Sequence, residues 1–585
     1  MPTQDNNDET ESSSEEDCDS SKSSSEGSSD SSEEEAESHS SSSESDDDES
    51  VMSEREESSN SEDDSAELLS PKVYENCDLS VDEGVLTLMN LFTKHKMSKT
   101  QMGGVLDAVL KFIPKSSNLP KTQYSLLNYV HKLSPISEVK VHFYCSKCLF
   151  YLGLVEMNCC HLCSGQPHKF YQIPLGDQVR NFFENHGLAD VIDKYSEKRN
   201  IADFGGGFSD MLDGSEFNRA RVNGPYNLTF MGHTDGISIS DSSDASLWPL
   251  EWVAAELPPH LRFKYIFISG IWVDNCKPYM NTLMAPFVEE LQQLRQHGVK
   301  WVDPKTKEAH VTFITVPSFC VDSPVRAQLQ NILLHGGRHC CHICEQKMKK
   351  LPPQPVLPGK KKKARRRVYT FAEHEATLRT SDRMEAQGKK TRRRLTKYGG
   401  KLNPEIGVKG PSVISGIPGC DRSTAVFPEY MHLLLCVVKQ FFSLWFVISG
   451  RWSLQEHRDE INKFLLSIRV PDFITRIPRS TEKFTKWKAN ELRSFVLFYS
   501  VIILSKCMTQ EYFQHWLLFV NAIYLLLQEH VSQNDVAKAN ILLRMFCRDF
   551  ANLYSPAHYT YYMHNLLHLA VTVERHGPLH CNAGF

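Results

Sequence analysis

The spacing of apolar residues separates a short helical stretch near the N-terminus from the rest of the chain. Three segments repeat apolar side chains at helical intervals, VLTLMNLFTKHKMS, QMGGVLDAVLKFI and TQYSLLNYVHKL, and PKSSNLPK separates the last two. They predict a small helical unit over residues 84–135. Such a unit is either a plain packing unit or a helix-turn-helix-type DNA-binding module.

Residues 220–345 change to an alternating α/β pattern. YNLTFMGHTDGISI, FKYIFISGIWVD and AHVTFITVPSFCVD are typical of buried strands, and APFVEELQQLRQHG over residues 285–298 is typical of a helix. Strands that alternate with helices predict a partly parallel sheet. From Phe427 onward the pattern is almost wholly helical, with wide apolar faces such as YMHLLLCVVKQFFSLWFVI that predict a packed core.

Composition adds a sharp division of charge. Of the 72 Asp and Glu and 65 Lys and Arg residues in the chain, residues 1–67 hold 26 acidic residues but only Lys22 and Arg55. The remaining 518 residues therefore carry 63 basic and 46 acidic side chains, or about +17. The Ser-rich acidic segment lacks the apolar surface needed to fold, so we expect residues 1–70 to be a disordered tail. The basic remainder is typical of a phosphate-binding protein.

Targeting and redox features favour an intracellular protein. The N-terminus is acidic and does not resemble a secretory signal, and the longest apolar runs are too short to span a bilayer, so we expect no membrane association. The 17 cysteines group into CxxC pairs, which indicates reduced thiols that hold metal and not a disulfide framework.

The first pair of CxxC motifs predicts a zinc ribbon over residues 140–170. Cys145 and Cys148 are followed, after eleven intervening residues, by Cys160 and Cys163, and an apolar link that fits a hairpin joins the two motifs. Four thiolates from two tight turns suit tetrahedral Zn²⁺. Cys159 remains an alternative to Cys160 as the third ligand, because the two residues are adjacent and His161 follows them.

A second metal site requires residues that lie far apart in the chain. HGGRHCCHIC contains Cys341 and Cys344 as a CxxC motif without a second motif nearby, whereas His564 and His568 lie four residues apart on a helical segment and so on one face. The four residues predict a Cys₂His₂ zinc site. Alternatively, the two histidines are simply buried in a helix, and Cys340, His339 or His342 supply ligands.

Two aspartates end predicted strands and could act together. Asp235 follows one apolar strand and Asp322 ends another. Carboxylates at the ends of neighbouring strands can hold Mg²⁺ or Mn²⁺, which activates a water or 3′-hydroxyl for attack on phosphate. By pattern alone, Asp in a turn after a strand is the more ordinary interpretation.

Residues 346–405 predict a basic linker, and the most basic stretch within it, residues 359–397, predicts binding to nucleic acid or nuclear import. Solvated loop charge is the alternative for a single basic run, but this stretch contains two. The candidate DNA-binding residues are Lys360, Lys361, Lys362, Lys363, Arg365, Arg366, Arg367, Lys389, Lys390, Arg392, Arg393 and Arg394.

Several segments together resemble CACTA (En/Spm-like) transposases, a DDE family related to the V(D)J recombinase catalytic subunit. They are GHTDGISISDSSDASLWPLEW, LPPHLRFKYIFISGIW, FCVDSPVRAQLQN, HCCHIC, GVKGPSVISGIPGCD, FPEYMHLLL and MHNLLHLAVTVERHGPLHC. The resemblance runs from about Cys145 to Phe585 and implies an α/β RNase H-like core with a large all-α insertion. It also implies cleavage and joining of DNA with Mg²⁺ or Mn²⁺ in the nucleus, with Asp235 and Asp322 as the first two catalytic acids. Cys341, Cys344, His564 and His568 match the zinc ligands that bracket the insertion.

The resemblance places the third acid, a Glu, shortly after the HxxxH helix. This sequence ends at Phe585, and Glu574 is the only acid after His568, on the same helix as the histidines. We therefore expect residues 406–585 to be the helical insertion, truncated before the third acid, and the implied activity to be incomplete. The alternatives are a domesticated, inactive nuclear DNA-binding or regulatory protein, and a zinc-stabilised scaffold without nucleic acid. Pairing of two DNA ends would suggest a homodimer.

Overall fold

The computed structural model describes residues 70–201, 206–239, 244–352, 366–398, 403–471, 474 and 476–582. The chain forms two compact units, Met1–Ser134 and Pro135–Phe585. Apart from Ser70, the predicted acidic tail lies outside the described residues.

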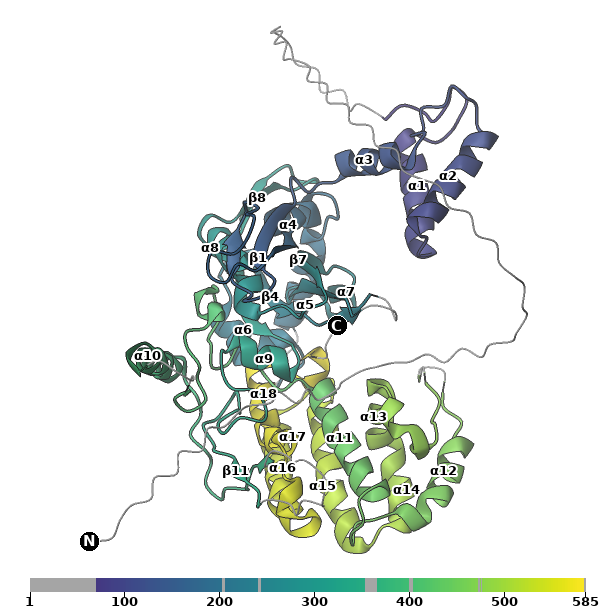
Figure 1. The fold of residues 1–585 in the computed structure, drawn as a ribbon. Helices are drawn as coiled ribbons and strands as arrows, with labels where there is room; N and C mark the ends of the chain where they lie inside the picture. Colours follow the sequence, from purple (N-terminus) through teal and green to yellow (C-terminus); the bar gives the residue numbers. More distant parts are fainter. Residues whose placement is uncertain are drawn as a thin grey trace, which may run out of the picture. The chain divides into compact units, whose positions relative to one another are not determined.

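The first unit contains three helices at the positions predicted from apolar periodicity (Figure 1). They are α1 (Val81–Lys94), α2 (Lys99–Phe112) and α3 (Gln123–Leu133). A hydroxyl side chain at each N-cap accepts a backbone N–H from the first turn, and the residue three positions on bonds back to the cap. These capping boxes satisfy helix-end donors that would otherwise lack partners. Val85, Leu106 and Leu126 form the core of the unit.

The second unit is built on an eight-stranded mixed sheet in the order β10-β4-β6-β7-β3-β1-β2, with β5 paired to β6. Strands β10 and β4 are parallel and the other pairs are antiparallel. The strands are β1 (Lys140–Cys145), β2 (Tyr151–Gly153), β3 (Pro167–Gln172), β4 (Leu228–His233), β5 (Ile237–Ser238), β6 (Ser246–Ala254), β7 (Phe267–Asp274) and β10 (Ile314–Phe319). The predicted mixed α/β class is confirmed.

Two features of this sheet differ from the sequence interpretation. The strands around the first pair of CxxC motifs, predicted as a separate zinc ribbon, belong to the main sheet. Strand β3 pairs with β7, which sets Phe170 opposite Trp272. Strand β6 was not predicted. It contains Pro249, which lacks the N–H of a central strand, and the β6–β7 register shifts directly afterwards, between Leu250 and Glu251. A bulge accommodates residues that a regular ladder excludes.

Helices and short elements complete this α/β region. They are α4 (Leu175–Glu184), α5 (Ala189–Ile201), α6 (Ser215–Ala220), α7 (Pro259–Arg262), α8 (Met280–His297), α9 (Ser323–Leu329), β8 (Val299–Val302), β9 (Ala309–Thr312), β11 (Lys349–Lys350) and β12 (Arg367–Val368). The core between sheet and helices contains large aromatic residues such as Phe183, Trp252, Trp272 and Phe287. It also contains Val426, whose isolated bridge to Phe319 is parallel. The α/β core was predicted over residues 220–345, but it also contains Val426, from the range predicted as the helical insertion.

The C-terminal region is all-helical, as its wide apolar faces predicted (Figure 1). Its helices are α11 (Tyr430–Phe446), α12 (Arg458–Ser467), α13 (Ala489–Ser494), α14 (Ser500–Cys507), α15 (Gln510–Leu526), α16 (Gln533–Tyr554), α17 (Tyr561–Asn565) and α18 (Leu569–His576). Phe441, Trp445, Trp516 and Phe546 pack together at its centre. Among the described residues, no helix combines the length and apolarity that a membrane span requires.

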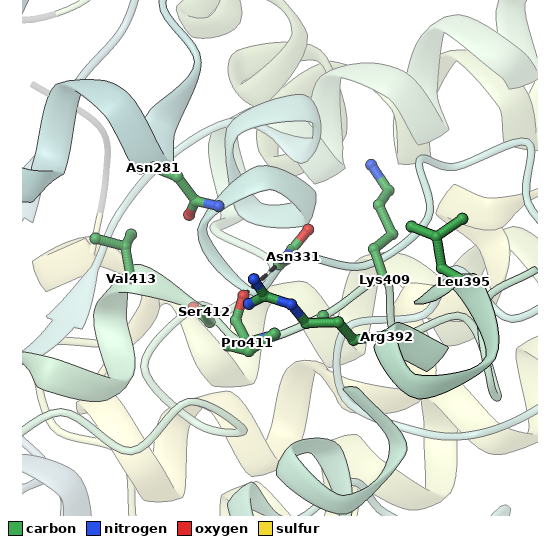
Figure 2. Close-up of a pocket in the computed structure, with 9 residues that line it drawn as sticks. Asn281, Asn331, Arg392, Leu395, Lys409, Pro411, Ser412 and Val413 are labelled. Atoms are coloured by element: carbon green, nitrogen blue, oxygen red, sulfur yellow. Dashed lines mark hydrogen bonds between the residues drawn. The ribbon is translucent and has the colours of Figure 1, made fainter. Parts of the chain in front are cut away.

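A helix also forms inside the predicted basic linker. It is α10 (Ser381–Tyr398), held to the α/β region by buried Met384, which packs with Ala327, Ile332 and Val408. Beside it lies a pocket of about 500 Å³ (Figure 2). The pocket is lined by Asn281, Asn331, Arg392, Leu395, Lys409, Gly410, Pro411, Ser412 and Val413.

Candidate metal centres and an acidic site

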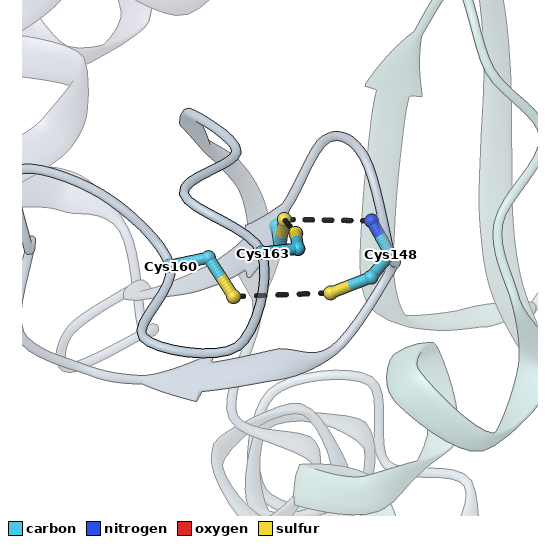
Figure 3. Close-up of side chains that lie close together, drawn as sticks. Cys148, Cys160 and Cys163 are labelled. Atoms are coloured by element: carbon cyan, nitrogen blue, oxygen red, sulfur yellow. Dashed lines mark hydrogen bonds between the residues drawn. The ribbon is translucent and has the colours of Figure 1, made fainter.

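Four cysteines converge where β1 ends. Cys145 is the last residue of β1, and Cys148 lies in the turn that leads to β2. The Sγ atoms of Cys145 and Cys163 are 3.4 Å apart and those of Cys148 and Cys160 are 3.8 Å apart (Figure 3). All four ligand atoms lie within 4.8 Å of one another, so this group could hold a metal ion such as zinc. Cys160 belongs to the group and exposed Cys159 does not.

The backbone around this Cys₄ group favours a thiolate at Cys145. Burial opposes ionisation of Cys145, but the N–H groups of Cys148 and Lys147 point at its Sγ from 3.4 Å and help lower its pKa to about 6. Gly165 approaches the same sulfur closely. A Cβ atom at Gly165 would stand 2.5 Å from the Cys145 Sγ, so the position accepts no side chain without displacing a ligand.

A Gly165→Ala variant is therefore expected to weaken metal binding at the Cys₄ group by at least about tenfold. The added methyl group would displace the Cys145 thiol, and changes to residues that orient metal ligands already weaken binding by about that factor. Competition with a chromogenic chelator would measure the affinity. Gly153→Ala is a useful control, since a Cβ there meets nothing within 4 Å. Its positive φ, which Gly165 does not share, strains the backbone without touching a thiol. Equal losses in both variants would contradict the ligand-displacement argument.

The second metal group joins residues more than 200 positions apart. The Sγ of Cys344 lies 3.2 Å from Nε2 of His564, and the Sγ of Cys341 lies 3.4 Å from Nε2 of His568. The two Nε2 atoms are themselves 3.3 Å apart, and all four ligand atoms lie within 4.8 Å of one another. These residues therefore also form a group that could hold a metal such as zinc.

Local structure aims the two histidines at the same point. His564 lies on α17, and a 3₁₀ turn over Leu566–His568 follows it before α18 begins. The backbone that leads to His568 is therefore wound more tightly than the regular α-helix expected for an i, i+4 pair. The ring of Tyr369 stacks on His564 at 3.9 Å, and all four ligands are buried. A dry, braced site of this kind suits a structural metal.

The neighbouring candidates have other partners. The thiol of Cys340 lies 3.4 Å from the hydroxyl of Tyr369 and 3.3 Å from the carbonyl oxygen of His335. His342 Nδ1 faces the hydroxyl of Tyr561 at 3.1 Å, and His339 Nδ1 faces the carbonyl oxygen of Glu345 at 3.0 Å. None of these three alternatives belongs to the ligand group.

The two aspartates lie at matched ends of parallel strands. Phe319, the last residue of β10, pairs with Gly232 of β4, and Asp322 and Asp235 each lie three residues after that pair, beyond the ends of their strands. Because adjacent strands are about 4.8 Å apart, both aspartates leave the sheet at the same end. Burial raises the pKa of Asp322, and so does the negative charge of Asp235, as expected for two carboxylates at one site.

One oxygen of each carboxylate is committed to the backbone. Oδ1 of Asp322 accepts the N–H of Val325 at 2.8 Å and so caps α9, while Oδ1 of Asp235 accepts the N–H of Gly236 at 2.7 Å. The second oxygens have no hydrogen-bond donor in the described part of the chain. They are available to a cation, although the two aspartates belong to neither group of three or more ligands in that part of the chain.

Two further residues at this site were not assigned from sequence. Glu429, fully buried, caps α11 by accepting the N–H groups of Met431 and His432, and its Oε1 lies 2.5 Å from Nδ1 of His432. Burial lowers the pKa of His432, but Glu429, Asp322 and Asp235 outweigh it and raise the pKa. Both residues belong to the segment FPEYMH, whose sequence indicates no role for them. Only the position of this segment, directly after Val426 at the sheet edge, shows that they lie near the aspartates.

The predicted DNA-binding residues are divided. Lys360, Lys361, Lys362, Lys363 and Arg365 lie outside the described residues. Arg366 donates to the carbonyl oxygen of Ala557, and Arg367 donates to that of Gly336. The other five lie on α10: Lys389, Lys390, Arg392, Arg393 and Arg394. Of the two predicted basic runs, the second thus lies on α10, and the last two residues of the first bond to backbone carbonyl oxygens elsewhere in the chain.

Compared with known protein families and with curated proteins, the chain gives no match to either. Its function must therefore be inferred from the sites themselves.

Proposed function

We propose that this protein is a DNA-binding protein of the DDE transposase type, with an RNase H-like core, that cuts DNA with the help of divalent cations. The observation that carries the proposal is the register of β4 and β10, from which Asp235 and Asp322 leave the sheet at the same end. The resemblance to CACTA transposases names the same two residues.

The sheet order supports the RNase H-like interpretation. Strands β4, β6 and β7 form an antiparallel meander, and β10 joins the meander in parallel beside β4. This order of three antiparallel strands with a parallel fourth strand is compatible with the RNase H-like core that the resemblance implies. The parallel bridge from Val426 to Phe319 lies where the next strand of such a core would run.

Asp235 and Asp322 would hold Mg²⁺ or Mn²⁺ through their second oxygens. When bound, such a cation activates the attacking oxygen and stabilises the leaving oxygen at phosphorus. His432, whose pKa Glu429 helps to raise, faces the same site and in its protonated form suits a phosphate. The two Cys-rich groups would hold structural Zn²⁺, and the Cys₂His₂ group ties α17 to the loop after α9.

The remaining parts of the proposal concern partners and location. A body with an excess of about 17 positive charges suits binding to DNA in the nucleus. Pairing of two DNA ends would involve a homodimer.

Incubation of the protein with supercoiled plasmid tests the proposal. We expect Mn²⁺-dependent conversion to nicked circles that EDTA abolishes, together with DNA binding that weakens steeply as salt rises. If the protein binds DNA but does not nick it, only the DNA-binding part of the proposal stands. If it neither binds nor nicks DNA, the whole proposal is overturned.

A second candidate, a DNA-binding regulator that does not cut, is favoured by one observation. The carboxylate of Glu429, which also lies near this site, has both oxygens engaged by backbone N–H groups. Glu429 therefore adds no available oxygen to those of Asp235 and Asp322 for holding a second metal ion.

A further inference from the structure

We propose that the exposed face of α10 formed by Lys389, Arg392 and Arg393 binds the DNA phosphate backbone, whereas Lys390 and Arg394 serve to hold the helix in place. This inference rests on the proposed DNA-binding function and deepens it, because it divides one basic cluster into two roles.

Helical spacing separates the five residues. Arg392 and Arg393 lie three and four positions after Lys389 and so share its face, whereas Lys390 and Arg394, four positions apart, share the adjacent face. Nζ of Lys390 lies 2.6 Å from Oε1 of Glu405, and a guanidinium nitrogen of Arg394 lies 2.7 Å from Oε2. One carboxylate therefore neutralises much of the second face.

The other face keeps its full charge. Lys389, Arg392 and Arg393 are exposed, and their side chains make no ion pair or hydrogen bond with any residue in the described ranges. Three cations on two helical turns repel one another unless an anion lies against them. A row of phosphates is an anion of matching extent.

Packing holds this face in a fixed direction. Thr391, on the side of the helix away from Lys389, is buried and donates to the carbonyl oxygen of Val408 at 2.8 Å. Gln387 donates to Glu345 at 2.8 Å. Gly388 approaches Gly410 so closely that a Cβ at position 388 would stand 2.8 Å from its backbone. A rigid support of this kind lowers the entropy lost when side chains bind a ligand.

Arg392 also reaches the pocket beside α10, which suits a section of backbone. Figure 2 shows its guanidinium directed toward Pro411 and Ser412, with Asn331 next to it. Lys409 lines the same pocket. Phosphates of a backbone bound to the exposed basic face could therefore continue into this positively charged pocket.

The position relative to the acidic site fits one DNA duplex. Helix α9 begins after Asp322 and has seven residues, and Asn331 of the pocket follows its C-cap. Seven helical residues span about 10 Å, which is roughly three base pairs of B-DNA at about 3.4 Å each. A duplex cut at the aspartates would therefore reach α10 a few base pairs from the cut.

Two double variants of the full chain test the division of roles, each removing two positive charges. Fluorescence anisotropy with a 30-base-pair duplex would be recorded at several salt concentrations. For Arg392→Ala/Arg393→Ala, the slope of log affinity against log salt should become shallower by about 1.8, which is about 30-fold weaker binding near 0.15 M salt. For Lys390→Ala/Arg394→Ala, the slope should stay within about 0.5 of the wild type.

The outcomes separate this inference from the function on which it rests. Equal slope changes in both variants would overturn the division of roles while leaving DNA binding intact, and so would an unchanged slope in Arg392→Ala/Arg393→Ala. A wild-type protein without salt-dependent DNA binding would overturn both. Circular dichroism confirms that each variant keeps its helix content.

Discussion

A Cys341→Ser variant should bind one zinc ion fewer per chain than the wild type and lose the attachment of α17 to the loop after α9. Metal-binding free energy is part of folding free energy, and reaches about 10 kcal/mol in small zinc domains. We therefore expect the stability of the helical region to fall by more than about 3 kcal/mol. Elemental analysis would measure the stoichiometry, and limited proteolysis would report the loosened helices.

Cys340→Ser is the matched control, because Cys340 is adjacent, equally buried and outside the ligand group. It should keep the full zinc content and wild-type protease resistance at the helical region. If Cys341→Ser also kept its zinc, the bracketing site would be wrong.

An Asp322→Asn variant should lose Mn²⁺-dependent nicking by more than about 100-fold while it still binds DNA. Changes in the outer shell of a metal site already cost about 10- to 100-fold, so the loss of a ligand should exceed that range. The fold should be kept, because Asn caps a helix as well as Asp does, and Oδ1 already accepts the N–H of Val325. Gel analysis of plasmid nicking would measure the rate.

Asp303→Asn provides a comparison of the same chemistry elsewhere. Asp303 is also buried and accepts backbone N–H groups, from Lys305 and Thr306, but in the turn between β8 and β9. It should nick DNA at the wild-type rate. Persistent nicking by Asp322→Asn would remove the aspartate pair from the mechanism and leave a DNA-binding protein.

Short-range chemistry explains which parts of the site could be predicted from sequence. A CxxC motif places two thiols in one turn whatever surrounds it, and His564 and His568 share a helical face by their spacing alone. Apolar runs likewise predicted β4 and β10, and with them the positions of Asp235 and Asp322.

Features that depend on tertiary contacts could not be predicted in the same way. Strand β6 contains Pro249, a residue disfavoured in central strands, and the sheet accommodates it beside a register shift. The polar sequence of α10 predicted a linker, because its few buried residues, such as Met384 and Thr391, meet partners far away in the chain. The capping role of Glu429 depends on where α11 begins relative to the sheet edge, which no local pattern specifies.

The distance along the chain between the ligands of the Cys₂His₂ group also orders the events of synthesis. The Cys₄ group spans 18 positions from Cys145 to Cys163, so it can close soon after its strands leave the ribosome. Cys344 must instead wait for His564, 220 residues later, which takes about 10 to 40 s at the usual rates of translation. During that interval the Cys341 and Cys344 thiols have no histidine partners. Availability of zinc and protection of those thiols by chaperones should therefore determine the yield of folded protein.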